Sequence, residues 1–209
     1  NLIKSFADYK NKGGKWGLKI IGSGDQYSKL VEMSEMISNK ENFEIINWLQ
    51  IDKLVDYYKN ASAFILPSYF DNWGLVVNEA IASSLPCIVS KNCGCAVDLI
   101  EHNISGFIFD PYNIKELSFF MKRIENQGNK EREKMIELAK QNLNKFDLDN
   151  FSRNFKEAIN LAKMMKIIGL IGYGVNSDYE NYRGDVIYCI SAGISLLHAI
   201  IPPSKLYKF

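Results

Sequence analysis

Short apolar segments alternate with longer amphipathic ones through the first 165 residues of the chain. Short apolar runs indicate buried strands, and apolar residues spaced three or four apart indicate helices. Strands are predicted at 17–21, 43–46, 61–66, 87–90 and 106–109, and helices at 1–10, 25–37, 52–59, 75–84, 96–101, 113–124, 129–144 and 147–165. This alternation, without a hairpin signal, predicts an α/β domain with a Rossmann-like parallel sheet and helices on both faces.

Polar residues mark several of the expected helix starts. Asp25 and Asp52 stand at the beginning of two amphipathic segments, and Asn113 precedes a third. Side chains of this kind accept hydrogen bonds from the free amide N–H groups of a first helical turn. We therefore expect Asp52 and Asn113 to cap their helices and Asp25 to lie near the start of its own.

The stretch from Pro67 to Ser90 predicts a strand, a loop, a helix and a second strand. Pro67 stops an apolar run, and Asp71, Asn72 and Gly74 form a loop rich in turn residues. The helix that follows ends at Leu85-Pro86 before the apolar run 87–90. This pattern is typical of a parallel βαβ unit whose loop opens at the carboxyl end of a strand, where open α/β sheets bind ligands.

The chemistry of this loop suits a phosphorylated sugar ligand, although a purely structural role fits the spacing equally well. The amide N–H groups of Gly74, Leu75 and Val76 would form the unpaired first turn of the helix and so bind an anion. Gly74 would let a ligand approach the backbone closely. Asp71 and Glu79 would stand on either side, with carboxylates that accept hydrogen bonds from sugar hydroxyls. The alternative is that Asp71 only caps the helix and Glu79 is solvated.

Two other positions allow a structural and a functional interpretation. Gly22 and Gly24 follow a predicted strand, which is typical of a tight turn near phosphates but also of an ordinary strand-to-helix turn. Trp48 follows the strand 43–46, where core packing is the favoured interpretation and stacking on a nucleobase the alternative.

Composition indicates a globular protein and excludes several classes. The chain has 209 residues, of which 47% are hydrophobic and 23% charged, and its net charge is +1. Basic residues are spread along the helices, so nothing favours nucleic-acid binding. The stretch 186–201 is shorter than the roughly 20 residues of a membrane span.

Cysteine and histidine positions favour neither a metal site nor a cofactor. Cys87, Cys93, Cys95 and Cys189 include no C-x-x-C pair, and His102 and His198 complete no ligand set. We expect Cys93 and Cys95 to be small, partly buried loop residues. The cysteines are interpreted as reduced thiols of a cytoplasmic protein.

The acids Asp71 and Glu79, separated by seven residues, resemble the acid-x7-acid motif of retaining glycosyltransferases. With Trp73-Gly-Leu-Val-Val-Asn-Glu-Ala80 and Leu85-Pro86, the stretch more closely resembles glycosyltransferase family 4, which has the GT-B fold. Four more family-like segments keep their order: Leu18-Lys-Ile-Ile-Gly-Ser-Gly24, Ala61-Ser-Ala-Phe-Ile-Leu-Pro-Ser68, Cys93-Gly-Cys-Ala-Val-Asp-Leu99 and Gly106-Phe-Ile-Phe-Asp-Pro111. The resemblance runs from the first residue to about Met165.

The resemblance implies the C-terminal, donor-binding half of a GT-B enzyme. Glu79 would bind the ribose of the nucleotide, and Asp71 would contact the transferred sugar, although the family usually has Glu there. The helix start at Gly74, Leu75 and Val76 would receive the pyrophosphate, and Trp73 would also belong to the substrate-binding residues. Gly22 and Gly24 would lie at the mouth of the donor site. The donor is a nucleotide sugar, and no cofactor or metal is required.

The resemblance also implies that the chain is incomplete. The acceptor domain comes first in the family, and the first strand of the donor domain, with its basic pair, would lie before Asn1, so we expect an N-terminally truncated domain at 1–165. This chain alone is then expected to transfer sugar poorly or not at all. Membrane association, peripheral at the inner face, would involve only the missing half.

The tail 166–209 has no family resemblance. Strands are expected at 167–171 and 186–191 and a short helix at 193–201. This tail is interpreted either as the start of another α/β unit or as a segment that does not belong to the fold. Two other functions stay open for the whole chain, namely a non-catalytic nucleotide-sugar-binding module that needs a partner chain, and a nucleotide-sugar epimerase.

Overall fold

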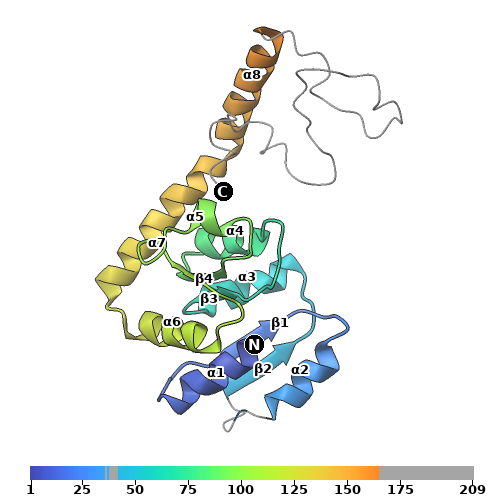
Figure 1. The fold of residues 1–209 in the computed structure, drawn as a ribbon, viewed down its shortest axis with the longest axis vertical. Helices are drawn as coiled ribbons and strands as arrows, with labels where there is room; N and C mark the ends of the chain where they lie inside the picture. The colour runs from blue at the N-terminus through green and yellow to red at the C-terminus, as the bar shows by residue number, and fades with distance from the viewer. Residues whose placement is uncertain (36, 38–41, 165–209) are drawn as a thin grey trace. The chain divides into compact units, whose positions relative to one another are not determined.

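A computed structural model describes residues 1–35, 37 and 42–164. Its helices are α1 (Leu2–Asn11), α2 (Tyr27–Ser34), α3 (Ile51–Asn60), α4 (Leu75–Ala82), α5 (Ala96–Leu99), α6 (Ile114–Asn126), α7 (Asn129–Leu143) and α8 (Leu148–Met164), with a 3₁₀ turn at Asn144–Phe146. Its strands are β1 (Leu18–Ile21), β2 (Phe43–Ile46), β3 (Phe64–Leu66), β4 (Cys87–Ser90) and β5 (Phe107–Phe109). The predicted alternation of strands and helices is confirmed (Figure 1).

All of the described strand pairs are parallel. β4 lies between β3 and β5 in one sheet, with Ile65 opposite Ile88 and Val89 opposite Ile108. β1 and β2 form a second sheet, in which Ile20 lies opposite Ile45. No described strand joins the two sheets by hydrogen bonds.

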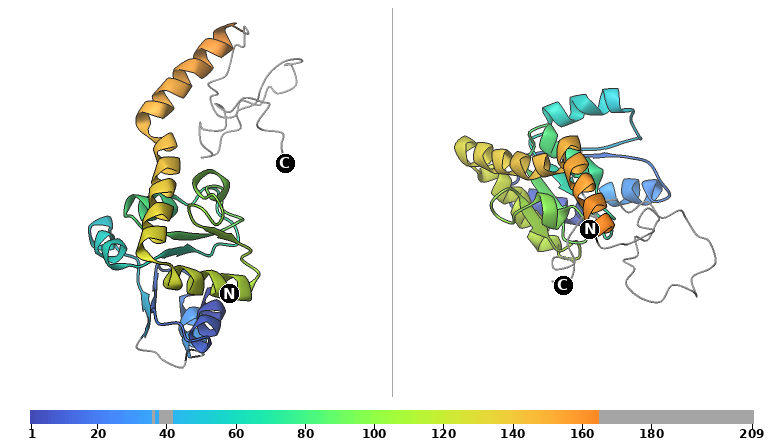
Figure 2. Two further views of the ribbon diagram at one scale, coloured as in Figure 1. Left: turned by 90° about the vertical axis from the view of Figure 1, so that its left-hand side faces the viewer. Right: turned by 90° about the horizontal axis from the view of Figure 1, so that it is seen from above.

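Helices cover both sides of the strands. α1 packs against α6, and α4 packs against α7 and rests on β3 and β4. Figures 1 and 2 show α1 and α6 on one side of the three-stranded sheet and α4 and α5 on the other. One apolar core contains Phe6 of α1, Ile88 of β4 and Phe107 of β5, and it extends to Ile20 of β1 and Ile65 of β3. The two sheets therefore share a single core.

Of the three polar residues expected at helix starts, two are confirmed and one is wrong. Asp25 lies near the start of α2, which begins at Tyr27. Asp52 lies inside the first turn of α3, one residue after its start. The side chain of Asn113 does cap α6 by accepting a hydrogen bond from the amide of Glu116.

The chain divides into two compact units at Asn144. The described part of the second unit consists chiefly of α8, in which the rings of Phe151 and Phe155 stack at 5.9 Å. The predictions for residues 166–209 lie outside the described residues. Among those that are described, no helix combines the length and apolarity needed to cross a membrane.

Candidate functional site

The start of α4 is the centre of the candidate site. Gly74 is the N-cap in a left-handed conformation, with φ 91° and ψ 60°, and its carbonyl accepts the first helical hydrogen bond, from Val77, at 2.9 Å. The amide N–H groups of Leu75 and Val76 belong to the first turn, where a helix offers them no carbonyl partner. Together with the helix dipole, they favour an anion at this position.

Gly74 is required by packing as well as by backbone conformation. A Cβ atom at this residue would lie 2.7 Å from Cδ2 of Leu66 and 3.3 Å from Sγ of Cys95. Gly74 is buried, so the side chain that it lacks would point into the protein. The sequence interpretation emphasised access for a ligand, whereas in the structure the left-handed backbone conformation and the close contact with Leu66 both favour glycine.

The loop before α4 is held against the loop that follows β4. Asp71 forms an isolated parallel bridge with Cys93, and the amide of Gly94 donates to the carbonyl of Asp71 at 3.0 Å. A Cβ atom on Gly94 would lie 2.0 Å from the carbonyl oxygen of Asn72, so only glycine allows this approach. Sequence reasoning missed this contact, although the Cys93-Gly-Cys95 segment could have indicated it.

The carboxylate of Asp71 forms a hydrogen bond within its own loop. Its Oδ1 accepts a hydrogen bond from the amide of Trp73 at 3.0 Å, and the side chain is half-buried. The indole Nε1 of Trp73 in turn donates to Oδ1 of Asn78 on α4. Asp71 therefore fixes the loop through one oxygen and keeps the other oxygen for a further contact.

Glu79 is half-buried and hydrogen-bonded, so the interpretation of a merely solvated side chain is wrong. Its Oε2 accepts a hydrogen bond from the hydroxyl of Tyr58 at 2.9 Å. Tyr58 lies on α3 and is buried. Burial, followed by the hydrogen bond to Glu79, raises the pKa of Tyr58, so the phenol stays protonated and acts as the donor.

Gly22 and Gly24 lie in the loop after β1. Their φ angles of 153° and 159° belong to a region that L side chains rarely adopt, while a Cβ atom at either residue would have open space. The amide of Gly22 donates to the carbonyl of Ile46 at 2.9 Å, which extends the pairing of β1 with β2. These glycines belong to the two-stranded sheet, whereas the acidic loop follows the three-stranded one.

The cysteines next to the site are buried and unreactive. Cys93 is 3% exposed and Cys95 is completely buried, so the expectation of partial burial is wrong. Burial, with negative charge nearby that includes Asp71, raises the pKa of Cys93 to about 11 and that of Cys95 to about 12. Both thiols are therefore protonated at neutral pH and are poor nucleophiles.

Trp48 lies on the surface. Its side chain is 65% exposed, so the interpretation that it packs in the core is wrong. β2 ends at Ile46, and Trp48 follows in the loop that leads to α3. A side chain in this position is available to a ligand.

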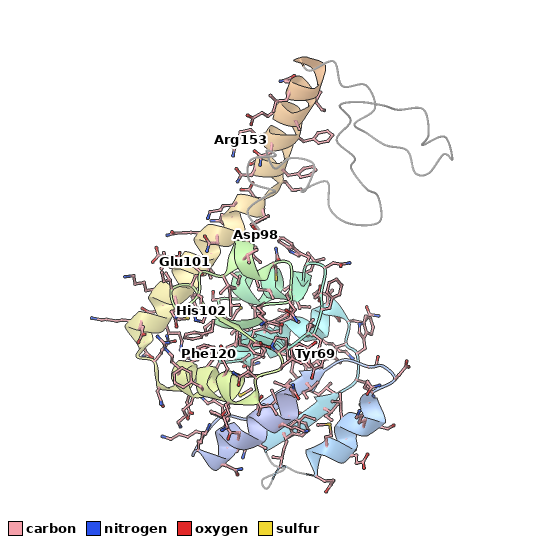
Figure 3. The ribbon with its side chains drawn as sticks, viewed as in Figure 1. Tyr69, Asp98, Glu101, His102, Phe120 and Arg153 are labelled. Atoms are coloured by element: carbon pink, nitrogen blue, oxygen red, sulfur yellow. The ribbon has the colours of Figure 1, made fainter. Side chains whose placement is uncertain are left out.

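His102 contributes to the packing and hydrogen bonding beside β5. Its Nδ1 accepts a hydrogen bond from the amide of Ile108 at 3.0 Å, and its ring lies edge-on to Phe107 and Phe120. Figure 3 shows His102 close to Phe120. Within the described ranges, no group of three potential metal-binding side chains occurs.

A shallow hollow of about 400 Å³ lies elsewhere, between α6 and α7. Its lining residues are Phe119, Lys122, Arg123, Asn126, Gln127 and Glu131, and none belongs to the candidate site. The two cations are already paired, Lys122 with Glu125 and Arg123 with Oδ1 of Asn103. The candidate site therefore depends on the start of α4 and not on this hollow.

Comparison with known proteins establishes the family. Residues 1–142 match the family described as Glycosyl transferases group 1, and the chain belongs to it. An uncharacterised glycosyltransferase of Haemophilus influenzae is 33% identical over 117 residues, covering 56% of this chain and 32% of that protein. A capsular polysaccharide biosynthesis glycosyltransferase of Staphylococcus aureus is 26% identical over 125 residues, covering 60% of this chain and 32% of that protein. The chain spans about a third of the length of these relatives.

Solved structures show the same fold. The crystal structure of TarM matches with a TM-score of 0.66 and 18% identity, covering 75% of this chain and 31% of that one. WaaG, a glycosyltransferase involved in lipopolysaccharide biosynthesis, matches with a TM-score of 0.59 and 20% identity, covering 70% of this chain and 39% of that one. The predicted Rossmann-like fold with GT-B neighbours is confirmed.

Proposed function

We propose that this chain is the donor-binding, C-terminal half of a retaining glycosyltransferase of family 4. Membership of a glycosyltransferase family supports transfer over epimerisation. The observation that carries the proposal is the start of α4, where free amide groups lie between Asp71 and Glu79 in the sequence. The relatives named for capsular polysaccharide and lipopolysaccharide synthesis favour a polysaccharide or glycolipid acceptor.

The proposed mechanism assigns one role to each group. The amide N–H groups of Leu75 and Val76 donate hydrogen bonds to the pyrophosphate and stabilise it as the leaving group. Glu79 holds the ribose, and Asp71 orients the sugar ring while its anomeric carbon becomes cationic. The indole of Trp73 donates a hydrogen bond to Asn78 and so holds the loop between the two acids in place. No metal enters this mechanism.

The proposal also covers the rest of the enzyme. Because the chain spans about a third of its curated relatives, we propose that a separate domain supplies the acceptor and that these 209 residues bind donor without transferring sugar. Free, buried thiols support a reducing, cytoplasmic compartment. Any contact with the inner face of a membrane would be made by the acceptor domain.

Calorimetric titration of the chain with UDP, GDP and ADP tests the donor site. One nucleotide is expected to bind with micromolar to millimolar affinity, and Glu79→Ala is expected to weaken it about 10- to 100-fold, since a hydrogen bond to a charged group is lost. The matched control is Glu133→Ala, which removes an exposed carboxylate from α7.

Three results would contradict parts of the proposal. A folded chain that binds none of the three nucleotides would exclude a donor site, and unchanged affinity in Glu79→Ala would exclude the ribose contact. Sugar transfer by the 209-residue chain would show that no separate acceptor domain is needed.

A further inference from the structure

Tyr58 and Glu79 come from different helices and meet through a single hydrogen bond. The phenolic oxygen of Tyr58, on α3, lies 2.9 Å from Oε2 of Glu79, on α4. The ring of Tyr58 is 8% exposed and packs against Phe64 of β3, with ring centroids 6.0 Å apart. Packing in the core therefore fixes the Tyr58 side chain, and this places its hydroxyl within hydrogen-bonding distance of the Glu79 carboxylate.

The chemistry of this pair leaves one carboxylate oxygen for a ligand. A phenol has one proton to donate, and a carboxylate can accept hydrogen bonds at both oxygens. With Oε2 held by Tyr58, rotation of the Glu79 carboxylate is restricted and the direction of Oε1 is set. Because Glu79 is only half-buried, a hydroxyl from solvent or a ligand can reach it.

We propose that Tyr58 is a positioning residue that fixes the Glu79 carboxylate so that Oε1 accepts a hydrogen bond from a ribose hydroxyl of the nucleotide donor. This inference rests on the proposed function, because it presumes that Glu79 binds ribose. It goes further by assigning the preference for ribose over deoxyribose to a residue outside the acidic motif. A prealigned acceptor loses less freedom when the ligand binds, which increases affinity.

The test compares nucleotides with and without the ribose hydroxyls. Isothermal calorimetry on the 209-residue chain uses whichever of UDP, GDP and ADP binds most tightly, together with its 2′,3′-dideoxy analogue. The unaltered chain should prefer the ribonucleotide about 10-fold or more. Tyr58→Phe should reduce this preference about 3- to 10-fold by weakening the ribonucleotide alone.

Two control variants separate positioning from stability. Tyr57→Phe removes a hydroxyl from the neighbouring residue of α3 and should keep the full preference. Ile124→Val trims a fully buried side chain of α6 and leaves both Tyr58 and Glu79 unaltered. It should lower the melting temperature while retaining the preference for ribose.

The outcomes distinguish this inference from the function on which it rests. If Glu79→Ala loses the preference but Tyr58→Phe keeps it, or if Tyr58→Phe weakens both nucleotides equally, the positioning role is overturned while the donor site stands. If the unaltered chain binds no nucleotide, or if Glu79→Ala keeps the preference, the ribose contact itself is overturned and the role of Tyr58 with it.

Discussion

At the scale of single residues, Trp48 shows that a sequence pattern does not determine the environment of a side chain. An aromatic residue after a buried strand looks the same in sequence whether or not another element covers it. In the structure β2 ends at Ile46, two residues before Trp48, and the side chain of Trp48 is 65% exposed. We propose that Trp48 stacks on the nucleobase of the donor, because a base gains affinity by stacking on an exposed aromatic ring.

Replacing Trp48 with alanine is expected to weaken nucleotide binding. Stacking of a base on an aromatic ring contributes about 1–3 kcal/mol, which corresponds to roughly 5- to 150-fold in affinity. Calorimetry with the same nucleotide measures the change, and Phe119→Ala, which removes another exposed ring from α6, is the matched control. Equal affinity in Trp48→Ala and the unaltered chain would exclude stacking at this residue.

The acids of the candidate site could be predicted from sequence, but their partners could not. Asp71 and Glu79 stand on either side of a helix start that turn residues and apolar spacing define locally. The bond from Tyr58 to Glu79 joins two helices whose contact depends on how both pack on β3, and no local pattern encodes that distance. Tyr58 was predicted only as one residue of a short helix.

At the scale of elements, apolar periodicity was sufficient to predict the strands and most of the helices. β2 and β4 have the predicted bounds, because Asn42 and Asn47 flank the first strand and Pro86 and Lys91 flank the second. β3 is shorter than predicted, since Ala61 and Ser62 are exposed and pairing with β4 begins at Phe64. The contact between the loops after β3 and β4 was not predicted, because backbone groups make it and Gly94 is its main signal in the sequence.

Gly94→Ala is expected to destabilise the domain through this pair of loops. A methyl group there would lie 2.0 Å from the carbonyl oxygen of Asn72, so the bonds from Gly94 and Cys95 to the acidic loop would have to shift. We expect a loss of about 1–3 kcal/mol in the free energy of unfolding, measured by urea denaturation. Nucleotide affinity should fall as well, since the acidic loop would move.

Gly128→Ala is the control for this prediction. Gly128 has a φ of −67° and open space where a Cβ atom would lie, so alanine fits there. It should cost at most about 1 kcal/mol through weaker capping of α7. Equal losses in the two variants would show that the contact between the loops contributes nothing specific to stability.

At the scale of the whole domain, two separate parallel sheets share one core. Parallel strands are normally buried on both faces. β4 is buried at every residue, whereas the apolar residues of β1 and β2 are only partly buried. Among the described residues, β1–β2 and β3–β5 stay separate, and no strand pairs with both sheets. We propose that a further parallel strand joins them, as the expected first strand of the domain would.

Hydrogen exchange followed by mass spectrometry tests this arrangement. In the 209-residue chain, amides of β4 should exchange most slowly, because both of its edges are paired and its side chains are buried. Amides of β1 and β2 should exchange much faster, since a two-stranded sheet with half-buried side chains is only marginally stable. In a longer form of the protein that places a strand beside β1 and β3, protection of both strands should rise toward that of β4. Protection of β1 in the 209-residue chain equal to that of β4 would mean that the sheet is already complete without a further strand.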